Sequence, residues 1–311
     1  MLRNLVLQMI EMTSKESRIK RHWQAIPVGE NVIGSLSRDF GGDYAAFFNS
    51  YDRWLYKTQS HILDALNEFQ WKGRRVLEIG LGQGSDSEQL IKRGALWSGI
   101  DLTAESVTRV RKRLELRSLP YENLVQASAT NIPFRDRLFD MVYSHGVLHH
   151  IPNIKGAQQE IRRVLKEDGR LVMMVYARNS LNYQVAIKWL RRMGLALMYV
   201  LPVEGTGIYT QHKKLAKQYG LFEYLKMKNF LHRSTDGPEN PYSKVYDERT
   251  IKQDFPDFHV VRTFKRWMHA PPLPVHGLPG EKHVGWHLWA ELKARAEDEL
   301  RHNGATTSSS H

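Results

Sequence analysis

Residues 76–87 read VLEIGLGQGSDS, in which a short apolar run enters three glycines at alternate positions, Gly80, Gly82 and Gly84. A helical pattern follows directly. Glycine is favoured where the backbone adopts a positive φ or where a ligand must approach it closely. A strand that ends in glycines and continues into a helix is typical of nucleotide-binding folds. The stretch therefore predicts the first strand–helix unit of such a fold.

Outward from this stretch, apolar runs alternate with helical patterns, which is typical of helices packed around a parallel sheet. Strands are expected at residues 75–80, 96–101, 123–127, 139–144 and 169–176, with helices at 84–93, 104–116 and 154–165. Residues 166–169 have turn chemistry. Two further strands are expected at 258–267 and 284–292, the latter with apolar residues on one face from Val284 onward.

Composition divides the chain further. We expect a helical extension at 1–40, a core with an N-terminal lid segment at 41–178 and a helical insert at 179–250. The last two strands of the sheet fall in 251–296, and a polar tail at 297–311 is predicted to be disordered.

Charged residues near the glycines point to the ligand. Asp101 ends the second strand, 23 residues after Glu78, where an acid accepts hydrogen bonds from ribose hydroxyls. A dinucleotide and S-adenosylmethionine both fit this pattern. The third glycine comes one residue earlier than in the dinucleotide fingerprint, and Asp86 in the first helical turn would repel a pyrophosphate. Glu78 suits a cationic group, so S-adenosylmethionine is favoured.

Four segments, at 78–84, 99–103, 127–153 and 163–169, together resemble the class I S-adenosylmethionine-dependent methyltransferases. They are most similar to the type 11 group, which methylates small molecules and lipids. The resemblance implies an α/β, Rossmann-like, seven-stranded and mostly parallel sheet with an antiparallel last strand. It also implies S-adenosyl-L-methionine as the cofactor, S-adenosyl-L-homocysteine as the product and no required metal.

The resemblance also assigns donor-binding positions. The three glycines would line the methionine part, Asp101 would hold the ribose and Leu102 would pack on the adenine. Ser128 stands where the family commonly has Asp, so a weaker, uncharged contact with the adenine amino group is expected. The full expected set is Glu78, Gly80, Gly82, Gly84, Asp101, Leu102, Ser128, Ala129, Ser144 and His145.

Other residues are candidates for chemistry or for the cavity wall. His145 and His149 are candidate general bases, because a pKa near 6.5 suits proton removal from a hydroxyl, although both could simply pack. The lid segment offers four candidates for the cofactor or substrate wall, with ordinary helix packing as the alternative: Tyr44, Phe48, Tyr51 and Arg53. Four later histidines lie in or beside a Pro-rich loop without clustered acids and are expected at the surface: His269, His276, His283 and His287.

The charge balance and the insert bear on the acceptor. The chain has 45 Lys and Arg against 33 Asp and Glu, a net charge of +12, and no Cys, which excludes thiol nucleophiles and thiolate metal sites. Residues 188–228 hold eight basic and two acidic residues beside an apolar helical pattern. We therefore expect an anionic or amphiphilic small-molecule acceptor, with peripheral membrane contact and a cytoplasmic location.

Two alternatives stay open. One is an RNA methyltransferase, against which stands the lack of an appended RNA-binding module or Lys-rich tail in the sequence. The other is a donor-binding protein without catalysis. The methylated atom (O, C or N) and the oligomeric state are left undetermined by the sequence.

Overall fold

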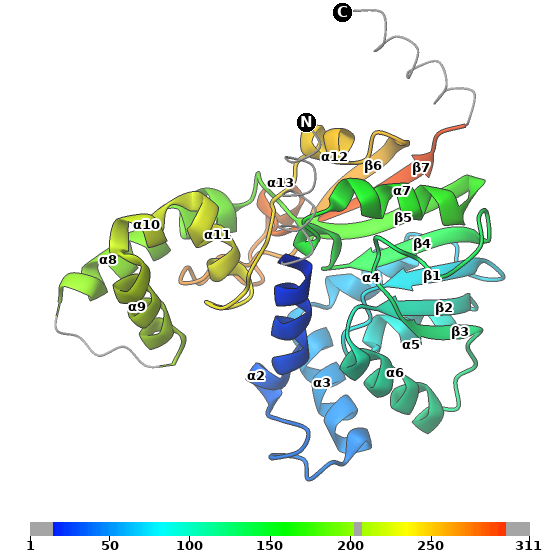
Figure 1. Ribbon diagram of the computed structural model, residues 1–311, viewed down its shortest axis with the longest axis horizontal. Helices are drawn as coiled ribbons and strands as arrows, with labels where there is room; N and C mark the ends of the chain where they lie inside the picture. The colour runs from blue at the N-terminus through cyan, green and yellow to red at the C-terminus, as the bar shows by residue number, and fades with distance from the viewer. Residues whose placement is uncertain (1–14, 202–206, 297–311) are drawn as a thin grey trace, which may run out of the picture.

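The structure is a computed structural model that describes residues 15–201 and 207–296 (Figure 1). Its centre is a seven-stranded sheet in the order β3-β2-β1-β4-β5-β7-β6. The strands are β1 (Arg75–Ile79), β2 (Leu96–Asp101), β3 (Asn123–Gln126), β4 (Phe139–His145), β5 (Leu165–Tyr176), β6 (Phe258–Arg266) and β7 (His287–Ala294). Strands β1 to β5 pair in parallel, and β7 runs antiparallel between β5 and β6. The predicted Rossmann-like sheet with an antiparallel last strand is confirmed.

Helices cover both faces of the sheet, so each central strand is buried on both sides. One face packs against α7 (Ile154–Val164) and α12 (Glu248–Asp254). The opposite face packs against α3 (Tyr44–Thr58), α4 (His61–Asn67), α5 (Ser85–Lys92) and α6 (Ala104–Leu116). Neighbouring residues of β5 illustrate the alternation, since Met173 belongs to the first core and Val172 to the second.

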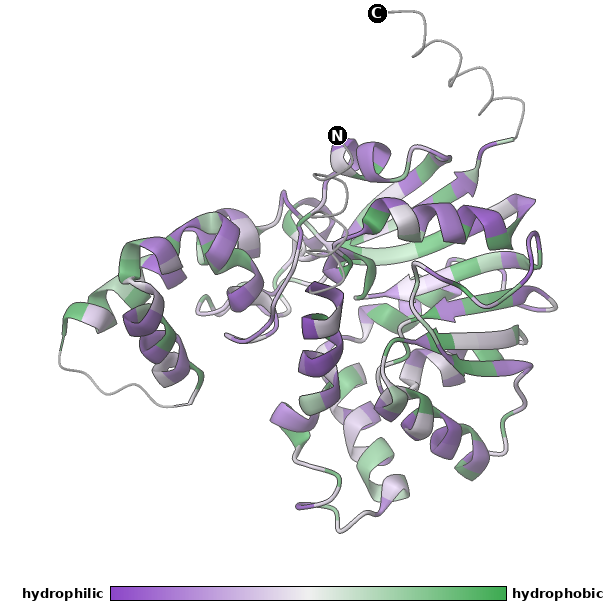
Figure 2. Ribbon diagram, in the orientation of Figure 1, coloured by the Kyte–Doolittle hydropathy of each residue, from purple (hydrophilic) through white to green (hydrophobic). Residues whose placement is uncertain are grey.

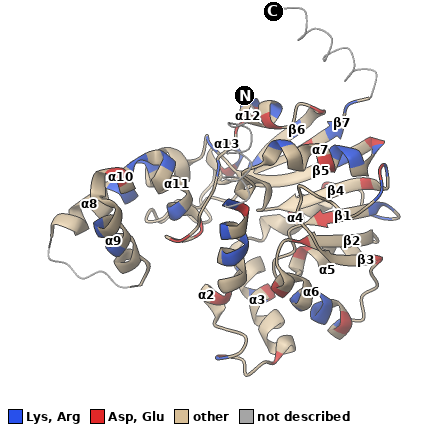
Figure 3. Ribbon diagram, in the orientation of Figure 1, with Lys and Arg blue, Asp and Glu red and all other residues tan. Residues whose placement is uncertain are grey.

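The helical insert forms a separate lobe beside the sheet (Figure 1). It contains the π-helical η2 (Asn182–Arg191), then α8 (Arg192–Val200), α9 (Ile208–Tyr219), α10 (Leu221–Leu225) and α11 (Met227–Thr235). Buried residues of the insert share a core that reaches back to the sheet region through Val245 and Trp286. Helices η2, α9 and α11 of the insert carry Lys and Arg residues (Figure 3). No helix in the described ranges is long and apolar enough to span a bilayer.

The N-terminal extension contains a helix at residues 15–25 and the short α2 (Glu30–Ile33). The first of these stands between the sheet and the insert (Figure 1). The earlier part of the predicted extension, residues 1–14, and the predicted tail at 297–311 lie outside the described residues.

Two local expectations were wrong. Residues 166–169, predicted as a turn, belong to β5, which begins at Leu165 and shifts register opposite Phe139 and Met141. That irregularity accommodates polar residues at the exposed end of the strand. The last strand begins at His287, because Val284 ends the short helix α13 (Glu281–Val284). Within β7 the predicted alternation is present, because Leu288, Ala290 and Leu292 pack into the core beneath α7 and α12, whereas the opposite face carries Trp289 beside polar residues.

Candidate functional site

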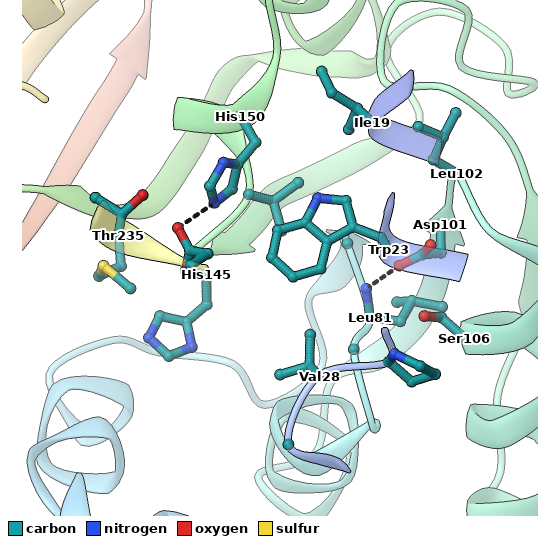
Figure 4. A pocket seen from close by; sticks show the side chains of 18 of the residues that line it. Ile19, Trp23, Val28, Leu81, Asp101, Leu102, Ser106, His145, His150 and Thr235 are labelled. Atoms are coloured by element: carbon teal, nitrogen blue, oxygen red, sulfur yellow. Dashed lines mark hydrogen bonds and ion pairs between the residues drawn. The ribbon is translucent and has the colours of Figure 1, made fainter. Parts of the chain in front are cut away.

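A cavity of about 540 Å³ opens at the carboxyl ends of the central strands (Figure 4). The glycine loop after β1, the ends of β2 and β4, the helix at 15–25 and the insert all contribute to its wall. This edge of a parallel sheet is where α/β folds bind their ligands. Asp101 and Leu102 lie toward one end of the close-up and His145 toward the other, with Trp23 between them.

Gly80 and Gly82 of the loop require glycine for different structural reasons. Gly80 has φ +82°, and a Cβ there would lie 2.1 Å from Val147 Cγ2. Gly82 has φ +52° and lines the cavity, where a Cβ would meet nothing within 4 Å. The first glycine is therefore required by internal packing, whereas the second leaves the backbone open to a ligand. Gly84 lies outside the lining, against Val110 on α6.

Asp101 holds the glycine loop and also faces the cavity. Its Oδ2 accepts a hydrogen bond from Leu81 N at 2.8 Å, and its Oδ1 accepts from Thr103 N and Oγ1, both at 2.8 Å. Burial raises the pKa of its carboxyl, against the lowering effect of these hydrogen bonds. A carboxylate can accept about four hydrogen bonds, so capacity for a ribose hydroxyl remains. Asp101 and the exposed backbone at Gly82 thus fit the nucleoside and methionine parts of S-adenosylmethionine.

The end of the cavity beside Leu102 contains a residue that the sequence did not indicate. The cavity is lined here by three of the expected donor-binding residues, Leu102, Ser128 and Ala129. Ser128 Oγ donates a hydrogen bond to Glu16 Oε1 at 2.6 Å, and Glu16 lines the cavity from the helix at 15–25. These partners are 112 residues apart, so no local pattern could have paired them.

Beneath the glycine loop lies a buried acid. Glu78 lines the cavity and accepts a hydrogen bond from Trp97 Nε1 at 2.7 Å. Burial, and then the charge of Asp86, raise the pKa of Glu78 to about 8. Ser144 occupies a different place from the expected one: it is fully buried, lies outside the lining and donates to the Ile79 carbonyl at 3.0 Å. It ties β4 to β1.

His145 and Asp86 form a buried pair at the cavity wall. His145 Nδ1 lies 2.8 Å from Asp86 Oδ2, which also accepts from the Tyr143 hydroxyl at 2.7 Å. Burial is the largest influence on Asp86 and would raise its pKa, but His145, Tyr143 and Arg113 together lower it. The ring of His145 stacks on Trp289, with centroids 5.2 Å apart. Its Nε2 is buried and finds no hydrogen-bond partner within residues 15–201 and 207–296.

His149 differs from His145 in both burial and position. It is fully buried against Tyr176, with ring centroids 3.9 Å apart, and lies outside the cavity lining. Burial lowers its pKa well below the usual value, and in the described part of the chain neither ring nitrogen has a hydrogen-bond partner. The cavity therefore meets His145 rather than His149.

The four candidate residues of the lid segment occupy different places in the structure. Tyr51 lines the cavity together with Trp54. Phe48 instead packs under the Arg113 guanidinium, 4.6 Å from the ring centroid, and Tyr44 contacts Phe48. Arg53 points to solvent. Of these four candidates, Tyr51 alone lines the cavity.

Aromatic rings and neutral histidines make the wall near the insert: Tyr176, Trp267, His269, Trp286 and His287. The expectation of surface histidines was wrong for His287, which is 4% exposed and whose Nδ1 lies 3.0 Å from His61 Nε2. It was also wrong for His269, which stacks on Trp267 and whose pKa burial lowers to about 4. Both were missed because β7 is an interior strand and the Pro-rich loop folds back over the cavity.

His276 and His283 are exposed, as expected. Across residues 15–201 and 207–296, no group of three or more His, Asp or Glu side chains is placed to hold a metal ion.

The insert contributes one guanidinium to the wall. Arg191 donates from Nε to the Pro271 carbonyl at 2.8 Å, from Nη1 to the Ser234 carbonyl and from Nη2 to Asn182 Oδ1 at 2.9 Å. All three partners are uncharged, and burial lowers the pKa of Arg191 to about 10. Among the residues that the structure describes, Arg191 has no acidic partner, and it therefore brings an uncompensated positive charge to the cavity.

The sheet order, the glycine loop and the acid after β2 define a Rossmann-like domain built to bind a nucleoside-containing donor. Residues 77–173 match the family model described as "Methyltransferase domain". A SAM-dependent methyltransferase structure from Methanosarcina mazei shares the fold, with a TM-score of 0.50 and 16% identity over 75% of this chain and 98% of that chain. Residues 77–173 thus match a methyltransferase domain, and the sheet has the fold of a known S-adenosylmethionine-dependent methyltransferase.

Curated relatives match over part of their length. The phthiotriol/phenolphthiotriol dimycocerosates methyltransferase 1 of Mycobacterium ulcerans is 26% identical over 54% of this chain and 63% of its own length. A fatty-acid O-methyltransferase of Mycolicibacterium smegmatis is 31% identical over 39% of this chain and 42% of its own length. A ubiquinone biosynthesis O-methyltransferase of Glaesserella parasuis is 28% identical over 56% of this chain and 72% of its own length.

Proposed function

We propose that the protein transfers a methyl group from S-adenosylmethionine to a small-molecule acceptor. The observation that carries this proposal is a single cavity with two chemically different ends. One end has the donor-binding features around Asp101 and Gly82, and the other has the aromatic and histidine wall beside the insert. The names of the three curated relatives, all methyltransferases of lipid or quinone-related compounds, agree with this class of reaction.

The protein's part in such a reaction is mainly alignment and exclusion of water. S-adenosylmethionine supplies an electrophilic methyl group on a sulfonium centre, and the reaction class is in-line displacement. Asp101 would hold the ribose, Leu102 would pack on the adenine and Gly82 would let the methionine part lie close to the backbone. Trp267 and Trp286 would hold the acceptor against that position. Fixing two reactants at reaction distance can supply several kcal/mol of the barrier reduction.

For a hydroxyl acceptor, we propose His145 as the general base. The lowered pKa keeps Asp86 ionised, and an ionised carboxylate can only accept, so the Nδ1 proton of His145 points to it. In the neutral imidazole, that contact leaves a lone pair on Nε2, which is buried and has no partner among the described residues. Buried polar atoms are rarely left unsatisfied, so an acceptor hydroxyl at Nε2 would complete this site.

The acceptor is proposed to be amphiphilic and anionic. The uncompensated charge of Arg191 suits a carboxylate or phosphate, while the aromatic wall suits an apolar body. Beside Arg191, η2 and α8 expose an apolar stripe, in which Trp189 is 60% and Met193 63% exposed. Figure 2 colours much of α8 as hydrophobic. Together with the basic residues of the insert, this stripe supports peripheral contact with an anionic membrane. A cytoplasmic location stays a prediction.

A labelling experiment separates the function classes. The protein is incubated with methyl-labelled donor and with lipid, polar-metabolite and RNA fractions of a cell extract. Label in a lipid or metabolite fraction is expected. Label in the RNA fraction alone would favour the RNA methyltransferase instead. Tight donor binding by calorimetry without label in any fraction would favour a binding protein without catalysis.

The base assignment is tested on the acceptor that this screen identifies. His145→Gln is expected to lower kcat by roughly 100-fold or more and to remove the acidic limb of the pH–rate profile, because proton removal is lost. Donor affinity should stay close to that of the wild type. His149→Gln is the matched control, with thermal denaturation to show that it folds. A larger kcat loss in the folded His149→Gln protein than in His145→Gln would reverse the assignment.

A further inference from the structure

The helix at residues 15–25 places an acidic side chain at the adenine end of the cavity. Glu16 Oε1 lies 2.6 Å from Ser128 Oγ, and both residues line the cavity. Ile19 and Trp23, one and two turns further along the same helix, line the cavity as well (Figure 4). The helix therefore forms one wall of the donor end.

This contact supplies the charge that Ser128 lacks. Ser128 Oγ is already engaged, since Thr130 N donates to it at 3.2 Å and Thr130 Oγ1 lies 2.8 Å away. Ser128 donates its own proton to Glu16, so its hydroxyl has little capacity left for a ligand. Within the described residues, Glu16 Oε2 has no protein partner. That free carboxylate oxygen is the stronger acceptor at this position, because charge-assisted hydrogen bonds are about twice as strong as neutral ones.

We infer that Glu16, from outside the matched domain, receives the exocyclic amino group of the donor's purine and so selects adenine. The inference rests on the proposed donor binding. An adenine amino group offers two N–H donors, whereas hypoxanthine presents a carbonyl oxygen at the same ring position. A carboxylate attracts the first and repels the second. The helix at 15–25 is thus part of the donor site as well as of its wall.

The test measures ligand affinity of the full chain by calorimetry, with S-adenosylhomocysteine and S-inosylhomocysteine as probes. The wild type should prefer the adenine ligand. Glu16→Ala should weaken adenine binding by about 10–100-fold, the range expected for a hydrogen bond to a charged group, and should reduce the preference. Ser17→Ala is the control, because Ser17 is exposed on the same helix.

A rescue variant keeps the test independent of helix stability. Ser128→Asp in the Glu16→Ala background returns a carboxylate to the same place and should restore both affinity and preference. Unchanged adenine affinity in Glu16→Ala, or an equal loss for both probes without rescue, would overturn the inference. Failure of the wild type to bind S-adenosylhomocysteine would instead refute the proposed donor binding itself.

Discussion

Arg113 joins the helix that follows the glycine loop to two other helices, and we expect its replacement to be severe. Its side chain is fully buried. Its Nη1 donates to Glu88 Oε2 at 2.8 Å and to Asp52 Oδ2 at 2.9 Å, and its Nη2 donates to Asp52 Oδ1 at 2.8 Å. The network links α6 to α3 and α5. Arg113→Met therefore leaves the buried Glu88 and the half-buried Asp52 without a guanidinium that both contact.

The size of the effect follows from what remains. Removing one partner of a buried ion pair costs about 3–5 kcal/mol. Glu88 keeps Lys92 at 2.5 Å and Arg117 at 3.6 Å, and Asp52 keeps Arg117 at 3.6 Å. These contacts place the expected loss in unfolding free energy near the lower limit, about 3 kcal/mol. At roughly 2–4 °C for each kcal/mol, Tm should fall by about 6–12 °C.

The pH dependence gives a second signature. Burial is the largest influence on Glu88 and would raise its pKa, but Lys92 and Arg113 together lower it. A lowered folded-state pKa stabilises the protein above the unfolded value, and this stabilisation is lost as pH falls through the folded value. The difference between wild type and Arg113→Met should therefore be larger at pH 7 than at pH 4.5.

Urea denaturation at both pH values provides the measurement. Lys112→Met is the matched control: it removes the same charge from the adjacent residue of α6, whose side chain is 52% exposed, and should cost under about 0.5 kcal/mol. The reasoning would be refuted if Arg113→Met lowered the unfolding free energy by less than about 1 kcal/mol, or if the decrease were the same at both pH values.

Two further predictions concern the glycine loop. Gly80→Ala should lower the unfolding free energy by about 1–3 kcal/mol and abolish donor binding, because it combines a positive φ with a clash against Val147. Gly73→Ala, with φ +73° but nothing within 4 Å of the added Cβ, should bind donor normally; equal binding losses would contradict this assignment. Donor binding at pH 7 should release close to one proton from Glu78, because its pKa is about 8 in the free protein and a cationic ligand group lowers it. Donor affinity should therefore increase from pH 6 to pH 8; calorimetry in buffers of different ionisation enthalpy detects the proton, and a release that persists in Glu78→Gln would exclude this source.

Much of the fold was accessible from the sequence because its signals are local. Predicted strand ends such as Asp101 match the structure, and most other ends differ by one or two residues. The positions of the glycines between β1 and α5 and of the acid at the end of β2 follow from the neighbouring strand and helix patterns in the sequence. The exceptions, at residues 166–169 and at Val284, depend on strand pairing, which residue pattern does not encode.

The candidate site likewise contains residues that the sequence could predict and residues that it could not. Gly82 and Asp101 could be predicted because their neighbours in the chain place them. The sequence offered Tyr44, Phe48 and Tyr51 as candidates for the cavity wall, with helix packing as the alternative, but it could not say which of them meets the cavity. That choice depends on how α3 packs against α6 and the glycine loop, through contacts such as that of Phe48 with Arg113.

The sequence by itself thus determined the class of sheet, the glycine loop and the place of the acid that ends β2. Only the tertiary structure decided the partners Glu16 with Ser128, Asp86 with His145 and His61 with His287. The second partner of each pair lies 112, 59 and 226 residues away along the chain. Hydrogen bonds and charge act over a few ångströms of space, so such pairs exist only after folding has brought distant segments together.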